Sequence, residues 1–119
     1  MKYLWTTIMV KDLEKSLEFY QEVIGLPLKK RFFAGEGKEI AFLGDGETQI
    51  ELIKDINDNS SVGSGISLGF QVESLDATMK FLSEKGIAIE SGPFQPNENI
   101  KFFYVLDPNF LKIQFSEEL

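Results

Sequence analysis

The sequence contains no cysteine and no histidine. The absence of cysteine excludes disulfides, thiolate nucleophiles and cysteine-based zinc sites. The absence of histidine excludes a Ser-His-Asp triad, a two-His-one-carboxylate iron site and every imidazole site for zinc or nickel. Any acid–base or metal chemistry in this chain must therefore depend on carboxylates and neutral oxygen groups.

The chain also lacks an excess of positive charge and a long hydrophobic run. Its 12 Lys and Arg residues against 19 Asp and Glu residues give a net charge of −7, which argues against nucleic acid and anionic membranes as partners. No apolar stretch approaches the roughly 18 residues of a membrane span, and the first residues hold no apolar segment of signal-peptide length. We therefore expect a cytoplasmic protein.

Apolar residues, and phenylalanine in particular, are abundant. The 119 residues are 43% hydrophobic and include 11 phenylalanines. This length and composition are typical of one domain with a full hydrophobic core. The many phenylalanines indicate a large aromatic interior or an aromatic-lined cavity.

The two halves of the chain resemble each other. Residues 1–53 correspond to residues 65–116, and the polar segment 54–64 links them. The stretch "TIMVKDLEKSLEFYQEVIGLPL" (7–28) aligns with "GFQVESLDATMKFLSEKGIAI" (69–89). A generic α+β sandwich without a true repeat is the alternative. Because spacing and element type agree, the pattern favours a single domain built from two copies of one module.

Each half begins with a strand and ends with a hairpin. In residues 5–10 and 66–72 the even-numbered side chains form one set, which is mostly apolar, and the odd-numbered side chains form another. This alternation predicts a strand in each half. Asp45-Gly46 and the turn at 107–109 predict the two hairpins. After the helix each half runs into two or three strands, the last two of which form the hairpin, so the pattern predicts a βαβββ module in each half.

The helices are predicted from caps and apolar stripes. Asp12 and Ser74 are suited to the N-caps, and Gly25 and Gly86 to the ends. Apolar residues recur at helical spacing between them, which predicts amphipathic helices that pack on the sheets. The residues of these stripes are Leu13, Leu17, Tyr20 and Ile24 in the first half, and Leu75, Met79 and Leu82 in the second.

Along the strands, alternate side chains face away from the helices. Ile50 and Leu52 belong to the helix side, which leaves Glu51 on the opposite face. If the modules are related by a twofold axis, these opposite faces form one concave surface, a geometry typical of a ligand site. The expected ligand-binding residues are Trp5, Thr7, Gln49, Ser67 and Gln114, and Glu51 is the candidate catalytic residue.

Two of these residues have a plain alternative. Glu51 either lines a pocket, as an acceptor or an anchor for a cationic or hydroxyl group, or is solvated on an open sheet face. Trp5 either stacks on a planar ligand or only fills space with its indole ring.

Two stretches of the sequence carry a resemblance to a known family. "TTIMVKDLEKSLEFYQEVIGL" resembles the opening of the glyoxalase/bleomycin-resistance proteins, the vicinal oxygen chelate superfamily. "FFYVLDPNFLKIQF" resembles the closing hairpin of that family. The resemblance covers nearly the whole chain and implies an α+β fold in which two βαβββ modules form a curved mixed sheet with the helices outside. The opening match rests on Val10, Asp12, Leu13, Ser16, Phe19, Tyr20, Gly25 and Leu26.

The resemblance also implies where a metal would bind. In lactoylglutathione lyases of this family two histidines and two glutamates hold a divalent metal, and the matching positions here are Trp5, Glu51, Ser67 and Gln114. Only Glu51 keeps a ligand type, and one carboxylate with neutral oxygens is a poor metal site. We therefore expect no metal and no other cofactor.

The closing hairpin departs from the family at Phe110, where the family usually has glycine. That turn position favours positive φ, which phenylalanine tolerates badly. Either the turn differs or the ring fills nearby space.

Three further features have open interpretations. The basic run 29–31 either binds an anionic group or is a solvated strand edge. The proline-containing segment 91–103 is expected to be a loop before a strand, which related proteins use as a lid. Asn97 and Asn99 then either meet a ligand or form a turn. Tyr104 either donates a hydrogen bond in the cavity or lies in the core.

Two functions follow from this sequence. The favoured one is metal-independent binding of a small, partly aromatic molecule, similar to the drug-binding members of the family. The alternative is a divergent lyase or isomerase that uses Glu51 as its base. A regulatory module with a vestigial pocket has no positive support. The resemblance also implies a homodimer.

Overall fold

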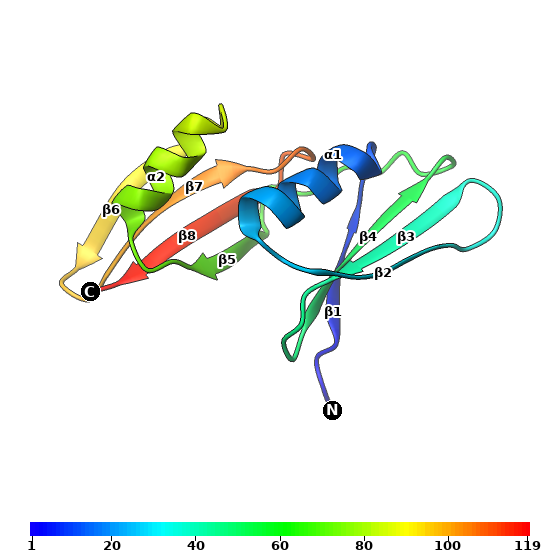
Figure 1. Ribbon diagram of the computed structural model, residues 1–119, viewed down its shortest axis with the longest axis horizontal. Helices are drawn as coiled ribbons and strands as arrows, with labels where there is room; N and C mark the ends of the chain where they lie inside the picture. Colours follow the sequence, from blue (N-terminus) through cyan, green and yellow to red (C-terminus); the bar gives the residue numbers. More distant parts are fainter. The chain divides into compact units, whose positions relative to one another are not determined.

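The computed structural model describes residues 1–119 and divides into two compact units, Met1–Val62 and Gly63–Leu119 (Figure 1). The boundary lies inside the predicted linker, residues 54–64. A single domain that includes both units stays a prediction. No helix of the chain is long and apolar enough to cross a membrane.

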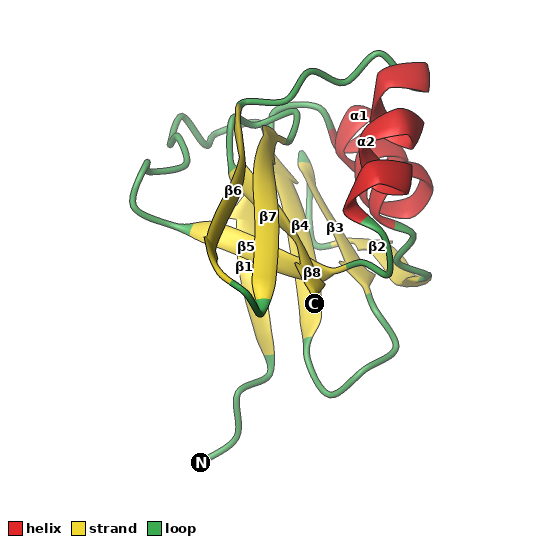
Figure 2. Ribbon diagram, turned by 90° about the vertical axis from the view of Figure 1, so that its left-hand side faces the viewer, coloured by secondary structure: helices red, strands yellow, loops and turns green.

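Both units have the same order of strands and helices. The first consists of β1 (Trp5–Met9), α1 (Leu13–Glu18), a π-helix η1 (Phe19–Ile24), β2 (Leu28–Phe33), β3 (Lys38–Leu43) and β4 (Gln49–Asp55). The second consists of β5 (Ser67–Gln71), α2 (Leu75–Glu84), β6 (Ser91–Asn97), β7 (Ile100–Leu106) and β8 (Lys112–Glu118). This order confirms the predicted α+β class with two βαβββ modules. Residues 1–4 precede β1 without regular structure (Figure 2).

Hydrogen bonds join the strands into two mixed sheets, with the orders β1-β4-β3-β2 and β5-β8-β7-β6. In each sheet the first strand pairs in parallel with the last, and the other pairs are antiparallel. The β3–β4 and β7–β8 hairpins are those that the turn residues predict. Thr7 lies opposite Glu51 in the first sheet, and Gly69 lies opposite Gln114 in the second.

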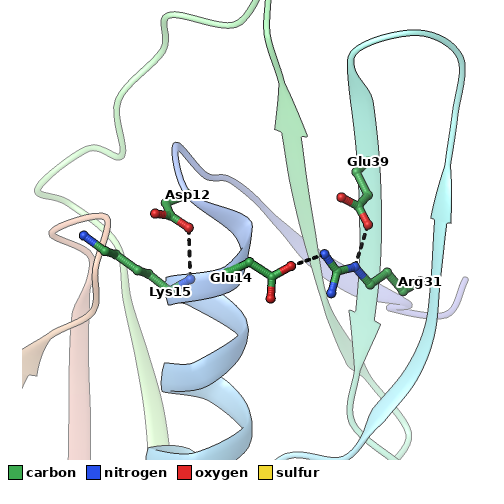
Figure 3. Close-up of polar contacts among 5 residues, drawn as sticks. All are labelled: Asp12, Glu14, Lys15, Arg31 and Glu39. Atoms are coloured by element: carbon green, nitrogen blue, oxygen red, sulfur yellow. Dashed lines mark hydrogen bonds and ion pairs between the residues drawn. The ribbon is translucent and has the colours of Figure 1, made fainter.

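Both helices begin at the predicted caps. The side chain of Asp12 accepts a hydrogen bond from the backbone N–H of Lys15 at 3.1 Å (Figure 3), and Ser74 caps α2 in the same way, also at 3.1 Å. The helical segments end near Gly25 and Gly86, whose φ angles of 90° and 75° suit glycine. Each helix contacts its own sheet, α1 at β4 and α2 at β8.

The first helix differs from the prediction in its second half. The spacing predicts one regular helix, whereas the chain changes to π geometry at Phe19. The backbone N–H of Gly25 donates to the carbonyl of Tyr20 at 3.1 Å, the wider turn of a π-helix. The adjacent rings of Phe19 and Tyr20 are both buried and contact edge to face, with centroids 5.2 Å apart. Burial of two consecutive aromatic side chains is a tertiary effect that helical spacing alone does not reveal.

Each core lies on the helix side of its sheet. In the first unit, Ile8, Ile50 and Leu52 are buried, as their alternation predicts. In the second unit, the central strands β7 and β8 supply the core, while the β5 side chains Leu68 and Phe70 are only half-buried. The fully buried residues of these central strands are Phe103, Val105 and Ile113.

Segment 91–103 is not the predicted loop. Residues 91–97 form β6, which pairs with β7 at Ser91, Phe94 and Asn97 and has irregular register between them. An edge strand tolerates proline because one side of its backbone needs no partner. The prolines at 93 and 96 therefore interrupted the sequence pattern without abolishing the strand.

The β7–β8 turn holds Phe110 at positive φ. The buried carboxylate of Asp107 accepts hydrogen bonds from the backbone N–H groups of Asn109 at 2.7 Å and Leu111 at 2.9 Å. Phe110 has φ of +65° and is 78% exposed. The predicted positive φ at this position is therefore confirmed, and the expectation that the ring fills nearby space is wrong.

Arg31 connects α1 to the β2–β3 hairpin (Figure 3). Its guanidinium donates to Glu39 of β3 at 2.5 Å and to Glu14 of α1. These two carboxylates raise the pKa of Arg31 above its usual value, Glu39 having the larger effect. The basic run 29–31 lies on the edge strand β2, as the second interpretation expects, but Arg31 is paired within its own unit.

Candidate functional site

The β1–β4 pair places four predicted ligand-site residues on one face of the first sheet. In register, Trp5 lies opposite Gln49 and Thr7 lies opposite Glu51. Their neighbours Ile50 and Leu52 point to the core and are 8% and 0% exposed. Strand alternation therefore brings Trp5, Thr7, Gln49 and Glu51 together on the face that α1 does not cover.

Glu51 is buried on this face. The residue is 9% exposed, and its Oε1 accepts a hydrogen bond from the Thr7 hydroxyl at 2.6 Å. No ion pair of the structure includes it. A carboxylate on an open sheet face would be solvated, so that alternative does not fit this burial. Burial of a charged group beside one neutral donor is unfavourable unless a further partner binds it.

Aromatic rings adjoin Glu51 on the same face. Phe42 of β3 lies opposite Glu51 in the antiparallel register. The ring of Phe42 contacts Trp5 edge to face at 5.2 Å between centroids and stacks on Phe32 at 6.4 Å. Trp5 and Phe32 are 42% and 40% exposed, so this face is open at both rings. Trp5 and Phe42 with Phe32 therefore form an aromatic wall beside the carboxylate.

Sequence reasoning missed Phe42 and Phe32. The alternation in "KEIAFL" carries the signal, because the hairpin at Asp45-Gly46 sets Phe42 against Glu51. The β2–β3 register was not predicted, and it is what brings Phe32 to the same face.

Lys30 lies over this aromatic wall. Its Nζ is 4.8 Å from the centroid of Phe42 and 5.8 Å from that of Phe32. Both distances are within the range of cation–π attraction. The rings of this face therefore already attract a cation from the chain itself.

The second sheet carries the corresponding polar residues. The Gln114 amide Nε2 donates to the hydroxyl of Tyr104 at 3.0 Å, and the hydroxyl of Ser116 donates to its Oε1 at 3.2 Å. Tyr104 lies opposite Gln114 in register and is half-buried, so it belongs to this face and not to the core. Ser67 lies opposite Lys112 and is exposed.

Aromatic rings also gather on this second face. Phe94, Phe102 and Tyr104 contact one another at centroid distances of 5.6 to 6.5 Å. An open, largely apolar depression is lined by Phe94, Gln95, Pro96 and Phe102. The Nζ of Lys112 lies 5.0 Å from the centroid of Tyr104. Each sheet thus has an aromatic face with one lysine over it.

Asn97 and Asn99 form the turn between β6 and β7. The side chain of Asn97 accepts a hydrogen bond from the backbone N–H of Asn99 at 2.7 Å. This contact agrees with the turn-forming interpretation of the two residues.

The residues at the metal positions of the family do not fit a metal site. The indole of Trp5 has only an N–H donor and no ligating atom. Gln114 uses both ends of its amide within its own unit. No group of three among His, Cys, Asp and Glu is arranged to hold a metal ion. Glu51 is therefore the one ligand of a suitable kind at these positions.

Each half of the predicted site is thus assembled within its own unit. Trp5, Thr7, Gln49 and Glu51 come together in the first, and Ser67 and Gln114 lie on adjacent strands in the second. The convergence of the two halves on one surface stays a prediction.

Comparison with known proteins gives a consistent result. The model of the Glyoxalase/Bleomycin resistance protein/Dioxygenase superfamily matches residues 2–115. The chain is 32% identical over 127 residues to the uncharacterized protein YraH of Bacillus subtilis. This alignment covers 95% of this chain and 97% of YraH. It is 32% identical over 128 residues to a lactoylglutathione lyase of Haemophilus influenzae, covering 98% of this chain and 93% of the lyase.

The fold also matches solved structures. TnmS3, an antibiotic binding protein from Streptomyces sp. CB03234, has a TM-score of 0.79 at 20% sequence identity, covering 100% of this chain and 97% of TnmS3. At this identity the likeness concerns the fold alone. The superfamily model matches residues 2–115, and the two relatives align over nearly the whole chain. The chain therefore belongs to the glyoxalase/bleomycin resistance protein/dioxygenase superfamily.

Proposed function

We propose that this protein binds a small, partly aromatic molecule without a metal ion, on the sheet faces that carry Glu51 and Gln114. The observation that carries the proposal is the environment of Glu51. Glu51 is 9% exposed, and its carboxylate lies beside the aromatic wall with one neutral hydrogen-bond donor. A ligand that stacks on the rings and also binds the carboxylate gains binding free energy from both contacts.

Each module offers its own candidate ligand contacts. In the first, Trp5 offers a ring and Thr7 and Gln49 offer polar groups beside it. In the second, Ser67 offers an exposed hydroxyl, and the Gln114 amide retains one N–H and one oxygen lone pair beyond its two hydrogen bonds. Such a combination of apolar rings with a few polar groups is typical of small-molecule sites.

Independence from metal is supported by donor chemistry. The lyase relatives belong to a family whose metal positions fall here on Trp5, Glu51, Ser67 and Gln114. One carboxylate and two neutral oxygens provide too few anionic ligands for tight binding of a divalent ion. We therefore propose that the chain uses no metal and no other cofactor.

The alternative proposal is a divergent lyase or isomerase with Glu51 as its base. It is favoured by the 32% identity to the lactoylglutathione lyase of Haemophilus influenzae. A buried carboxylate is also a suitable proton acceptor. Against it, the polarising metal of such chemistry has no matching ligand set in this chain.

We also propose that the chain is a homodimer, since the family resemblance implies one. Size-exclusion chromatography with light scattering tests this directly. A mass of 27 kDa, twice the 13.5 kDa of one chain, supports the dimer, whereas a mass of 13.5 kDa overturns it.

A fluorescence titration tests the binding proposal. Trp5 is the single tryptophan, so the emission at the proposed site has no contribution from another tryptophan. A panel of small aromatic compounds is titrated in EDTA, with Trp5 emission as the signal and Glu51→Gln as the site variant. We expect saturable changes in EDTA. Glutathione-dependent turnover that requires added Ni²⁺ or Zn²⁺ and is abolished in Glu51→Gln overturns the proposal in favour of the lyase.

A further inference from the structure

We infer that the ligand of the Glu51 face is a small organic cation, a quaternary or protonated amine that carries an aromatic group. This inference rests on the proposed function and names the chemical class of its ligand. It is carried by one juxtaposition within the first unit, the buried residue Glu51 beside the rings of Trp5 and Phe42.

The charge of Glu51 is the first step. The residue is 9% exposed, and the hydroxyl of Thr7 is the neutral hydrogen-bond donor to its carboxylate. A hydroxyl ligand would add a second neutral donor and leave the buried charge without a counter-ion. A cation supplies the counter-ion, whether it is quaternary or protonated, and a protonated amine also donates a charge-assisted hydrogen bond, which is about twice as strong as a neutral one.

The rings are the second step. Phe42 lies opposite Glu51 in register, and Trp5 contacts Phe42 at 5.2 Å. Aromatic ring faces carry negative charge density, which attracts cations and repels anions. The carboxylate and the rings therefore favour the same sign of ligand.

Lys30 supplies independent evidence for this preference. Its Nζ lies over Phe42 and Phe32, 4.8 Å and 5.8 Å from their centroids, although the residue is exposed and free to extend into water. It pairs with no carboxylate. The ammonium of Lys30 thus occupies part of the surface that a ligand cation would use, and it competes with that cation.

The face is accessible to such a ligand. Trp5 and Phe32 are 42% and 40% exposed at its two ends, and Glu51 lies between their strands. The aromatic group of the ligand meets the exposed rings, while its ammonium lies near the Glu51 carboxylate. The net charge of −7 also favours the approach of a cation over that of an anion.

The test compares three probes of similar size: benzyltrimethylammonium, benzyl alcohol and phenylacetate. Binding is followed by the ¹⁵N–¹H resonance of the Trp5 indole, the only such signal in the protein. We expect the cation to bind at least tenfold more tightly than either other probe. The variants are Glu51→Gln and Lys30→Met, with Lys29→Met as the matched control, because Lys29 is exposed on the same strand and makes no cation–π contact.

The two variants are expected to act in opposite directions. Glu51→Gln weakens benzyltrimethylammonium binding at least tenfold, because it removes the counter-ion. Lys30→Met strengthens it by roughly threefold, as expected when a like charge near the same ring is removed. Lys29→Met leaves it unchanged. Lys30 is on the surface, so its variant keeps the test valid even if Glu51→Gln folds poorly.

Other outcomes separate this inference from the proposed function. Preferential binding of benzyl alcohol or phenylacetate overturns the cationic ligand but leaves small-molecule binding standing. Weaker cation binding in Lys30→Met also overturns the inference, because Lys30 would then be aiding the ligand. If no probe shifts the Trp5 resonance at millimolar concentration, both the inference and the binding role of this face are contradicted.

Discussion

The turn between β7 and β8 holds Phe110 in a conformation that favours glycine, which leads to a stability prediction. With φ of +65°, a residue with a β-carbon is strained by about 1–2 kcal/mol. Alanine at a compatible position stabilises a protein over glycine by about 0.4–1 kcal/mol through the unfolded chain. Here the strain is the larger effect. We therefore expect Phe110→Gly to be more stable than Phe110→Ala by about 0.5–1 kcal/mol.

The comparison of the two variants isolates the backbone from the ring. Phe110 is 78% exposed, so both variants lose the same small ring contact. The matched control is Lys80, an exposed residue inside α2 with ordinary helical geometry. There the order is reversed, and Lys80→Gly is expected to be about 1 kcal/mol less stable than Lys80→Ala.

Urea unfolding followed by circular dichroism measures all four variants. The denaturation midpoint is compared at equal m values, so that a shift reports stability alone. If Phe110→Ala equals or exceeds Phe110→Gly while the Lys80 pair behaves normally, the turn does not hold positive φ. The account of this hairpin would then be wrong.

Three further variants test other contacts. Asp107→Ala removes the acceptor for two backbone N–H groups in a buried turn. We expect the free energy of urea unfolding to fall by about 2–4 kcal/mol. A loss below about 1 kcal/mol would show that the turn does not depend on that carboxylate. Tyr104→Phe removes one partly buried hydrogen bond to Gln114 and is expected to cost about 1 kcal/mol, and an unchanged midpoint would exclude this contact. Arg31→Met removes the ion pairs that connect α1 to β3. We expect the free energy of unfolding to fall by about 1 kcal/mol or less, and this difference to shrink in 1 M NaCl. A difference that does not depend on salt would instead assign Arg31 a packing role.

The local structure was largely predictable because its determinants are local. Asp12 and Ser74 indicate where the helices begin, because their side chains accept hydrogen bonds from backbone N–H groups of the first turn. Alternation around Ile50 and Leu52 assigns the two faces of β4, and it places Glu51 correctly away from the core. These patterns depend on neighbours a few residues apart.

The elements that were missed depend on distant contacts. The prolines of β6 interrupted the strand pattern in the sequence. They are tolerated because β6 lies at the edge of its sheet. The π-helix follows from burying Phe19 and Tyr20 together, and helical periodicity contains no sign of it. The place of Phe32 in the site depended on the β2–β3 register, which turn residues do not specify when the connection is irregular. The carboxylate was therefore predictable, and most of its aromatic surroundings were not.

Native mass spectrometry of the protein as purified, without added metal, is the most direct test of metal-independent binding. We expect an organic adduct on the chain and no stoichiometric divalent metal. The adduct should be lost or reduced in Glu51→Gln. One divalent metal ion per chain, removed by EDTA and absent from Glu51→Gln, would contradict the proposal and assign Glu51 to a metal site.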